Sequence, residues 1–264
     1  MDRISSLGNT SPFKRRLYLV GGSLTLPAIW FFVSEMHLVR ELYFPAPARV
    51  LTAAIEIRPN LLVQSLSTVA LSLSGYVTGI ALAFIFGLLQ RVSAVGRFGL
   101  SVIFETMRPV PPVALIPFFI IWFGFAWYGK WILVSLGVFL LVYPAIVNGV
   151  DNLSPIYYRL ARTLGGTDVE FIRHCAVPAI IPGLLGQLRV GASFSLAMAV
   201  ISEYMGSDLG LGRIINISLN TFSTHTIVLC MILLGLIGYF LDLAIRVLHA
   251  KGTSWAPRVE DALK

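Results

Sequence analysis

The chain has 264 residues, of which 56% are hydrophobic and only 12% are charged. A soluble globular domain carries about 25% charged residues, so this composition excludes an ordinary soluble enzyme and favours a membrane protein. The net charge of +7 does not indicate nucleic-acid binding, because basic residues scattered around apolar runs usually set membrane orientation.

Apolar runs long enough to cross a bilayer, about 20 residues each, recur along the chain. The first extends from Leu17 to Val33 behind Lys14–Arg16 and lacks a small-residue cleavage site, so we predict an uncleaved span. Later spans are predicted near residues 62–89, 98–123, 131–150, 180–200 and 227–247. The predicted fold is all-α and polytopic, with about six transmembrane helices over residues 17–250 and cytoplasmic tails at residues 1–16 and 251–264.

The second predicted span carries a small residue every four positions: Gly75, Gly79, Ala83 and Gly87. In lipid, such a stripe lets another helix backbone approach closely. The alternative is a flexible glycine-rich helix, and the regular spacing favours helix packing.

The third predicted span is interrupted by prolines, which cannot all lie inside one unbroken helix. Backbone groups freed at membrane depth must face protein or a water-filled cavity, so this segment is the predicted translocation path. Charged residues in spans are functional candidates, with a structural ion pair as the alternative. Arg189 either lines the path or pairs with an acid such as Glu105 or Glu203. The candidate pathway residues are Glu105, Arg108, Pro111, Pro112, Arg189 and Glu203.

A polar interval at residues 152–182 lies between the fourth and fifth predicted spans. Ser154 and Pro155 predict a helix start, and an apolar stripe follows at Ile156, Leu160 and Leu164. Gly165 and Gly166 predict the helix end. Thr167 with Glu170 predicts a capping box for a second short helix, which Pro178 is expected to end.

This interval resembles the cytoplasmic "EAA" coupling loop of permease subunits of bacterial ABC importers. Ala161, Gly165 and Pro178 fall in register with that family's pattern, whereas the chain departs from it at Arg159, Leu160, Cys175 and Val177. The segments ARTLGG, VPAIIPG, SEYMGSDLGLG, FPAPARV and RPVPPVALIPFFIIWFG resemble the nitrate/sulfonate/taurine-type branch.

The resemblance implies a permease that works with two ATPase subunits, a second permease copy and an extracytoplasmic binding protein. The solute would be a small anion such as a sulfonate, taurine or nitrate. This chain would hold no cofactor, because ATP and magnesium would bind the partner ATPase. The residues implied to contact the ATPase are Ile156, Tyr157, Arg159, Leu160, Ala161, Arg162, Leu164, Gly165, Gly166 and Asp168.

Six spans would place both termini on one side of the membrane. Thirteen of the twenty lysines and arginines then lie on the side of the termini and of residues 152–182, against five on the other. The positive-inside rule therefore predicts that the termini and this loop are cytoplasmic. The resemblance implies that the membrane is a bacterial inner membrane.

Other chemistry has little support in the sequence. Gly124–Lys130 has phosphate-loop spacing, but Trp131 stands where that motif needs Ser or Thr. The four histidines show no metal-ligand spacing, and no catalytic constellation is recognisable. The alternative function is an autonomous ion-coupled transporter or channel, for which Glu105, Glu203 and Asp242 are candidate coupling carboxylates.

Overall fold

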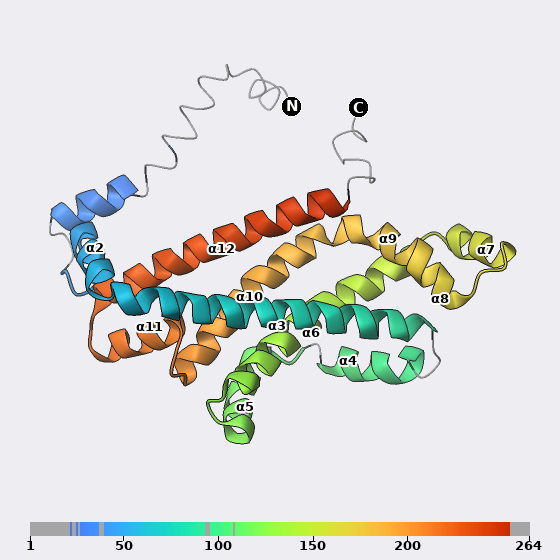
Figure 1. Cartoon of the computed structure of the whole chain (residues 1–264), viewed down its shortest axis with the longest axis horizontal. Coiled ribbons are helices and arrows are strands. Elements are labelled where there is room, and N and C mark those ends of the chain that lie inside the picture. The colour runs from blue at the N-terminus through green and yellow to red at the C-terminus, as the bar shows by residue number, and fades with distance from the viewer. Residues whose placement is uncertain are drawn as a thin grey trace, which may run out of the picture. The chain divides into compact units, whose positions relative to one another are not determined.

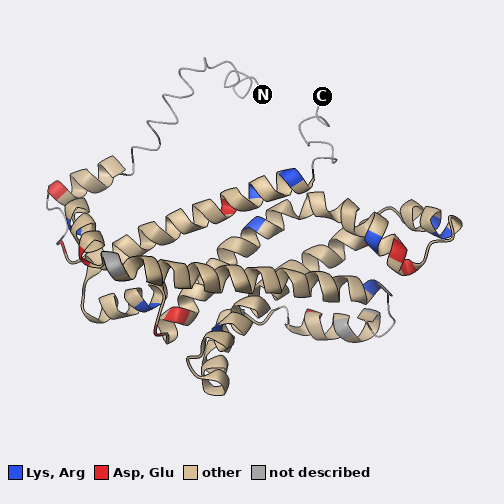
Figure 2. Ribbon diagram, in the orientation of Figure 1, with Lys and Arg blue, Asp and Glu red and all other residues tan. Residues whose placement is uncertain are grey.

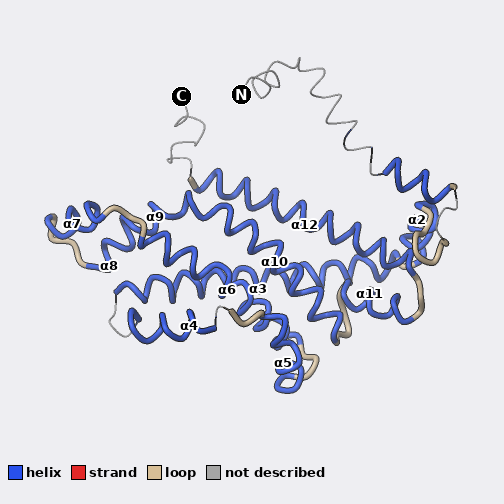
Figure 3. Tube along the Cα trace, turned by 180° about the vertical axis from the view of Figure 1, so that it is seen from behind, coloured by secondary structure: helices blue, strands red, loops and turns tan. Residues whose placement is uncertain are grey.

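The computed structural model describes residues 22, 25, 27–36, 40–92, 96–107 and 109–253. Every regular element among them is a helix, which confirms the predicted all-α class (Figure 3). The longer helices in chain order are α2 (Pro47–Glu56), α3 (Arg58–Val92), α4 (Ser101–Met107), α5 (Ile116–Phe123), α6 (Trp127–Asp151), α7 (Pro155–Thr163), α10 (Leu185–Met205), α11 (Leu211–Asn220) and α12 (Thr224–Gly252).

Four helices of the described chain are long and apolar enough to cross a membrane: Asn60–Arg91, Trp127–Asp151, Asp168–Met205 and Thr224–Gly252. A fifth span results if Ser101–Met107 and Pro112–Phe123 form one broken unit, since they are bent by 89° where prolines interrupt the chain. The predicted count of six is not confirmed, because the expected first span at 17–33 lies only partly within the described residues.

The chain divides into two compact units, Met1–Arg58 with Ile217–Leu229, and Pro59–Asn216 with Cys230–Lys264. In the first unit, Trp30 Nε1 donates at 3.0 Å to the carbonyl of Pro45, which lies two residues before the start of α2. The Thr224 hydroxyl donates to the Leu42 carbonyl, which joins the two chain segments of this unit.

The core of the second unit is built around α6. In the most apolar stretch of α6, 56% of the residues are buried, against 11% in that of α12. Leu71 and Ala83 of α3 pack with buried side chains of α6. Met198 and Ala199 of α10 complete one of the two core clusters. The helices α3 and α10 are therefore fixed against a common central helix (Figure 1).

The small-residue stripe of α3 lies against α6. A Cβ atom added at Gly75 would be 2.5 Å from Val134 Cγ1, and one at Gly79 would be 2.6 Å from the Ser135 carbonyl oxygen. At Gly87 the nearest atom would be Ile146 Cγ2, at 3.0 Å. Ala83, on the same face, is fully buried. The backbones approach so closely that a side chain at Gly75 or Gly79 would overlap α6.

Candidate functional site

A helical elbow within residues 152–182 forms one end of the second unit. As predicted, α7 begins with Ser154 at its N-cap position and Pro155 in its first turn, although the Ser154 side chain makes no capping hydrogen bond. At the other end Gly165 adopts φ +81°, its N–H donates to Arg162 O at 3.0 Å, and the Gly166 N–H donates to Ala161 O at 2.9 Å. These bonds form a Schellman motif, so the predicted glycine stop of α7 is confirmed.

The second arm of the elbow begins at α8 (Asp168–Phe171) with the predicted capping box. Glu170 Oε2 accepts from the Thr167 N–H at 2.7 Å, and the Thr167 hydroxyl accepts from the Glu170 N–H at 3.3 Å. The two arms are linked because Tyr158 donates to Asp168 at 2.9 Å and its ring packs edge-on against Phe171. The elbow therefore has a defined angle rather than a loose hinge.

The apolar stripe of α7 points outward. Ile156 is 67% exposed, Leu160 is 58% exposed and Leu164 is 79% exposed. Tyr157 and Arg159 are also exposed, whereas Ala161 and Gly166 are half-buried. Arg162 lies 3.8 Å from Asp168, so it stabilises the elbow itself. Several charged residues lie on and around α7 and α8, whereas α3 is uncharged between its ends (Figure 2).

Helix continues from the elbow into the membrane span, contrary to the expected break at Pro178. After α8, a π-helix at Ile172–Ala176, α9 (Val177–Ile180) and a 3-10 helix at Ile181–Leu184 lead directly into α10. The Val177 N–H bonds back to Ile172 O, a wider turn directly before the proline. The changes of helical type accommodate the missing N–H groups of Pro178 and Pro182. Residues 168–205 thus form one uninterrupted helical segment that changes direction near α9, and we refer to this bent segment as the rod (Figure 1).

The base of the elbow is tied to α3. Arg91, in the last turn of α3, forms an ion pair with Asp151 at the end of α6. A cavity of about 290 Å³ lies beside this pair, bordered by Tyr158, Asp168 and Phe171. The elbow is therefore connected to α3 and α6 as well as to α10.

The predicted pathway residues differ in their exposure. Glu105 is exposed on α4, Pro111 is exposed, and Glu203 is only 1% exposed. Pro112 is half-buried, and its Cβ would be 3.6 Å from a Cβ added at Gly137 of α6. Arg108 lies outside the described residues. The role of these residues in translocation therefore stays a prediction.

Arg189 pairs with Asp242 of α12, not with Glu105 or Glu203, so both expected partners are wrong. Arg189 Nε donates to Asp242, its Nη2 donates to the other carboxylate oxygen at 3.1 Å, and Arg246 Nη2 lies 2.6 Å from that second oxygen. The spacing of Asp242 and Arg246, four apart on one helix, was the sequence signal for this cluster.

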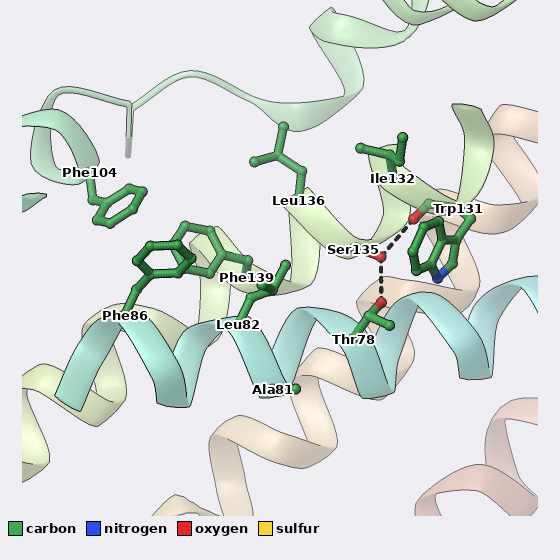
Figure 4. A pocket seen from close by; sticks show the side chains of 10 residues that line it. All are labelled: Thr78, Ala81, Leu82, Phe86, Phe104, Trp131, Ile132, Ser135, Leu136 and Phe139. Carbon is green, nitrogen blue, oxygen red and sulfur yellow. Dashed lines mark hydrogen bonds between the residues drawn. The ribbon is translucent and has the colours of Figure 1, made fainter. Parts of the chain in front are cut away.

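A cavity of about 460 Å³ lies between α3, α4 and α6 (Figure 4). Its wall is apolar except for Thr78 and Ser135, whose hydroxyls are 2.6 Å apart. Ser135 in turn donates to the Trp131 carbonyl at 2.7 Å. Because the lining is almost wholly apolar and both hydroxyls already have partners, the cavity does not suit an anion, and we do not assign it to the solute.

Proteins with similar sequences are named as transport permeases. The taurine transport system permease protein TauC of Escherichia coli is 27% identical over 94% of each chain. The putative aliphatic sulfonates transport permease protein SsuC of Bacillus subtilis is 26% identical, over 86% of this chain and 83% of its own.

Solved structures share the fold. An inward-facing MetNI methionine ABC transporter chain aligns with TM-score 0.58 and 19% identity, over 73% of this chain and 97% of its own. A chain of an amino acid ABC transporter aligns with TM-score 0.60 and 17% identity, over 78% and 98%. The family model for binding-protein-dependent transport system inner membrane components matches residues 75–251, and the chain therefore belongs to this family of ABC transport permeases.

Proposed function

We propose that this chain is the membrane subunit of an ATP-driven importer, works as a homodimer, and receives a small anionic solute from an extracytoplasmic binding protein. Two ATPase subunits dock on residues 152–182, and ATP and magnesium bind those subunits. The observation that carries this proposal is the exposed apolar face of α7, held at a fixed angle on a helix that continues into a membrane span.

Exposure of the apolar face of α7 to water is unfavourable in free energy. Three large apolar side chains at spacing four, exposed at the end of a polar elbow, are typical of a helix that fits into a groove of a partner. Burying each leucine would contribute about 1.5–3 kcal/mol. The ATPase groove is the occupant that fits, because the elbow carries the positive charge expected on the cytoplasmic side.

Movement of the docked ATPases would be transmitted through the rod. The elbow has no flexible linker, because α8 continues as helix to Met205. Closure of an ATPase pair would therefore tilt α10 directly and, through the Arg91–Asp151 pair, displace α3 and α6. The transport cycle requires that ATP-bound and ATP-free partners bind the elbow differently in the two membrane conformations.

The proposed solute is a sulfonate such as taurine, or a related small anion such as nitrate. Relatives over most of the chain are named for taurine and aliphatic sulfonates. The chain itself contributes a cluster at Arg189, Asp242 and Arg246 with one more positive than negative charge. Such a cluster is compatible with an anion nearby, although its arginines already share a carboxylate.

Association with the ATPase tests the proposal. Leu160→Asp places a charge on the apolar face of α7 and should abolish co-purification with the partner ATPase. Leu160→Met, which conserves volume and apolarity, should leave co-purification unchanged. Equal recovery of the ATPase with both variants would refute docking on this face.

Uptake into vesicles tests the energy source and the solute. Vesicles holding the assembled transporter, its binding protein and internal ATP should accumulate labelled taurine or nitrate, and vesicles holding this chain alone should not. Uptake by the chain alone under a proton or sodium gradient, indifferent to ATP, would instead establish the autonomous ion-coupled transporter.

A further inference from the structure

A short turn between α10 and α11 is held by buried side chains. Three consecutive backbone N–H groups point away from the turn: Gly210 donates to Gln64 Oε1, Leu211 donates to Thr68 Oγ1 at 2.9 Å, and Gly212 donates to Glu203 Oε2 at 3.1 Å. These N–H groups lie at the start of α11, where a helix has no internal acceptors. Side chains from two other helices therefore cap α11.

The capping residues form one connected cluster. The Thr68 hydroxyl donates to Glu203 Oε2 at 2.8 Å while it accepts from Leu211. Gln64 is 7% exposed, Thr68 is 0% exposed and Glu203 is 1% exposed. Gln64 and Thr68 lie one turn apart on α3, and Glu203 lies in the last turn of α10. The cluster thus joins the ends of α3 and α10 to the start of α11.

The turn packs so closely against its neighbours that three of its positions have no room for a side chain. A Cβ atom at Gly206 would lie 2.0 Å from the Phe125 ring, and one at Gly212 would lie 2.2 Å from the Val200 carbonyl oxygen. Gly210 has φ +119°, and its added Cβ would be 2.1 Å from Glu203 Cδ. These contacts explain the spacing of glycines in the GSDLGLG segment.

The central helix also holds the turn. Lys130, in the first turn of α6, donates to the Ser207 hydroxyl at 2.6 Å, and Ser207 donates to the Leu209 carbonyl at 2.6 Å. The long helices α3, α6 and α10 are therefore all attached to the seven-residue turn Gly206–Gly212. The turn has no freedom to shift unless those helix ends shift with it.

If Glu203 served only to pack these helices together, an apolar side chain would do so without the free energy of desolvation that a buried carboxylate requires. Taking an ionised group out of water costs several kcal/mol, and well-packed apolar residues often replace buried charges without loss. A carboxylate at a helix N-terminus, however, satisfies N–H groups and is favoured by the helix dipole. Glu203 is therefore suited to hold α11 in one orientation.

We propose that Glu203 is a positioning residue for transport, which with Thr68 and Gln64 makes the Gly206–Gly212 turn move together with α10. The inference rests on the proposed function, because the elbow at residues 155–171 drives the same helical rod from its other end. The turn lies at the opposite end of that rod, on the face where the binding protein delivers solute. When the ATPase subunits displace the rod, the turn moves with it, and the surface that the binding protein contacts changes.

Hydrogen exchange on the purified full chain in lipid nanodiscs tests the attachment without any partner. Thr68→Val keeps the side-chain shape but removes the hydroxyl, and should accelerate exchange over residues 206–213 about tenfold, whereas Thr68→Ser should not. Ser72→Ala is the matched control, because Ser72 bonds to Ser195 between α3 and α10, 2.9 Å apart, but does not contact the turn. Equal exchange in Thr68→Val and Thr68→Ser would overturn the attachment.

Function of the assembled transporter tests the positioning role. Glu203→Leu should keep assembly and basal ATP hydrolysis but lose at least tenfold in stimulation by the loaded binding protein. Glu203→Gln, whose amide oxygen can still accept from Thr68 and Gly212, should restore most of that stimulation. If Glu203→Leu accelerates exchange at the turn yet is stimulated normally, Glu203 is only structural. Failure of the unmodified chain to bind any ATPase would refute the proposed function but not the attachment.

Discussion

The contact between α3 and α6 predicts that adding one methyl group destabilises the protein at Gly79 and not at Gly235. A Cβ atom at Gly79 would lie 2.6 Å from the Ser135 carbonyl oxygen and 2.7 Å from Val138 Cβ. Neither atom is the end of a flexible side chain, so the helices must move apart. Overpacking of this kind costs typically about 1–3 kcal/mol, against about 1 kcal/mol gained from the higher helix propensity of alanine. Gly79→Ala should therefore destabilise the chain by up to about 2 kcal/mol.

Gly235 provides the matched control, because a Cβ atom added there meets nothing within 4 Å. Gly235→Ala should be neutral or stabilise the chain by up to about 1 kcal/mol. Thermal unfolding in detergent, followed by fluorescence-detected size exclusion, should show Gly79→Ala melting several degrees below the unmodified chain and Gly235→Ala melting at or above it. If Gly79→Ala melts no lower than Gly235→Ala, the close approach of α3 to α6 is wrong.

Three other changes test the elbow and the charged cluster. Thr167→Ala removes the cap of α8 and should cost about 1 kcal/mol, measured as faster hydrogen exchange at the Glu170 amide; unchanged exchange would argue against the capping box. Gly165→Ala forces a side chain into φ +81° and should cost about 1 kcal/mol, measured as easier proteolysis of the elbow, whereas resistance equal to the unmodified chain would contradict the Schellman turn. Arg189→Asp should lower thermal stability and Arg189→Asp with Asp242→Arg should recover it; a double variant no more stable than the single one would exclude the pair.

Local sequence patterns predicted the parts of the elbow that local bonds determine. Gly165 with Gly166, and Thr167 with Glu170, specify a helix end and a helix start through bonds within a few residues. The small-residue stripe on α3 was visible in the same way, because its spacing of four is a property of a single helix.

Contacts between distant segments were not predictable by the same means. Pro178 was expected to end a helix, but the π-helix before it supplies a wider turn, and nothing in the local pattern distinguishes the two outcomes. The partner of Arg189 is 53 residues away, on a helix whose orientation the sequence does not define. Thr68 and Glu203 are 135 residues apart, so their bond depends on the packing of α3 against α10.

The central claim is that α7 receives force from an ATPase on the cytoplasmic side. A photoreactive phenylalanine placed at Leu164, which is 79% exposed, tests it in intact cells. The account predicts an ultraviolet-dependent adduct between this chain and the ATPase subunit, with no ATPase adduct from the same probe at Phe222, which lies between α11 and α12 and is 73% exposed. An adduct with the extracytoplasmic binding protein, or none with the ATPase in an assembled transporter, would contradict it.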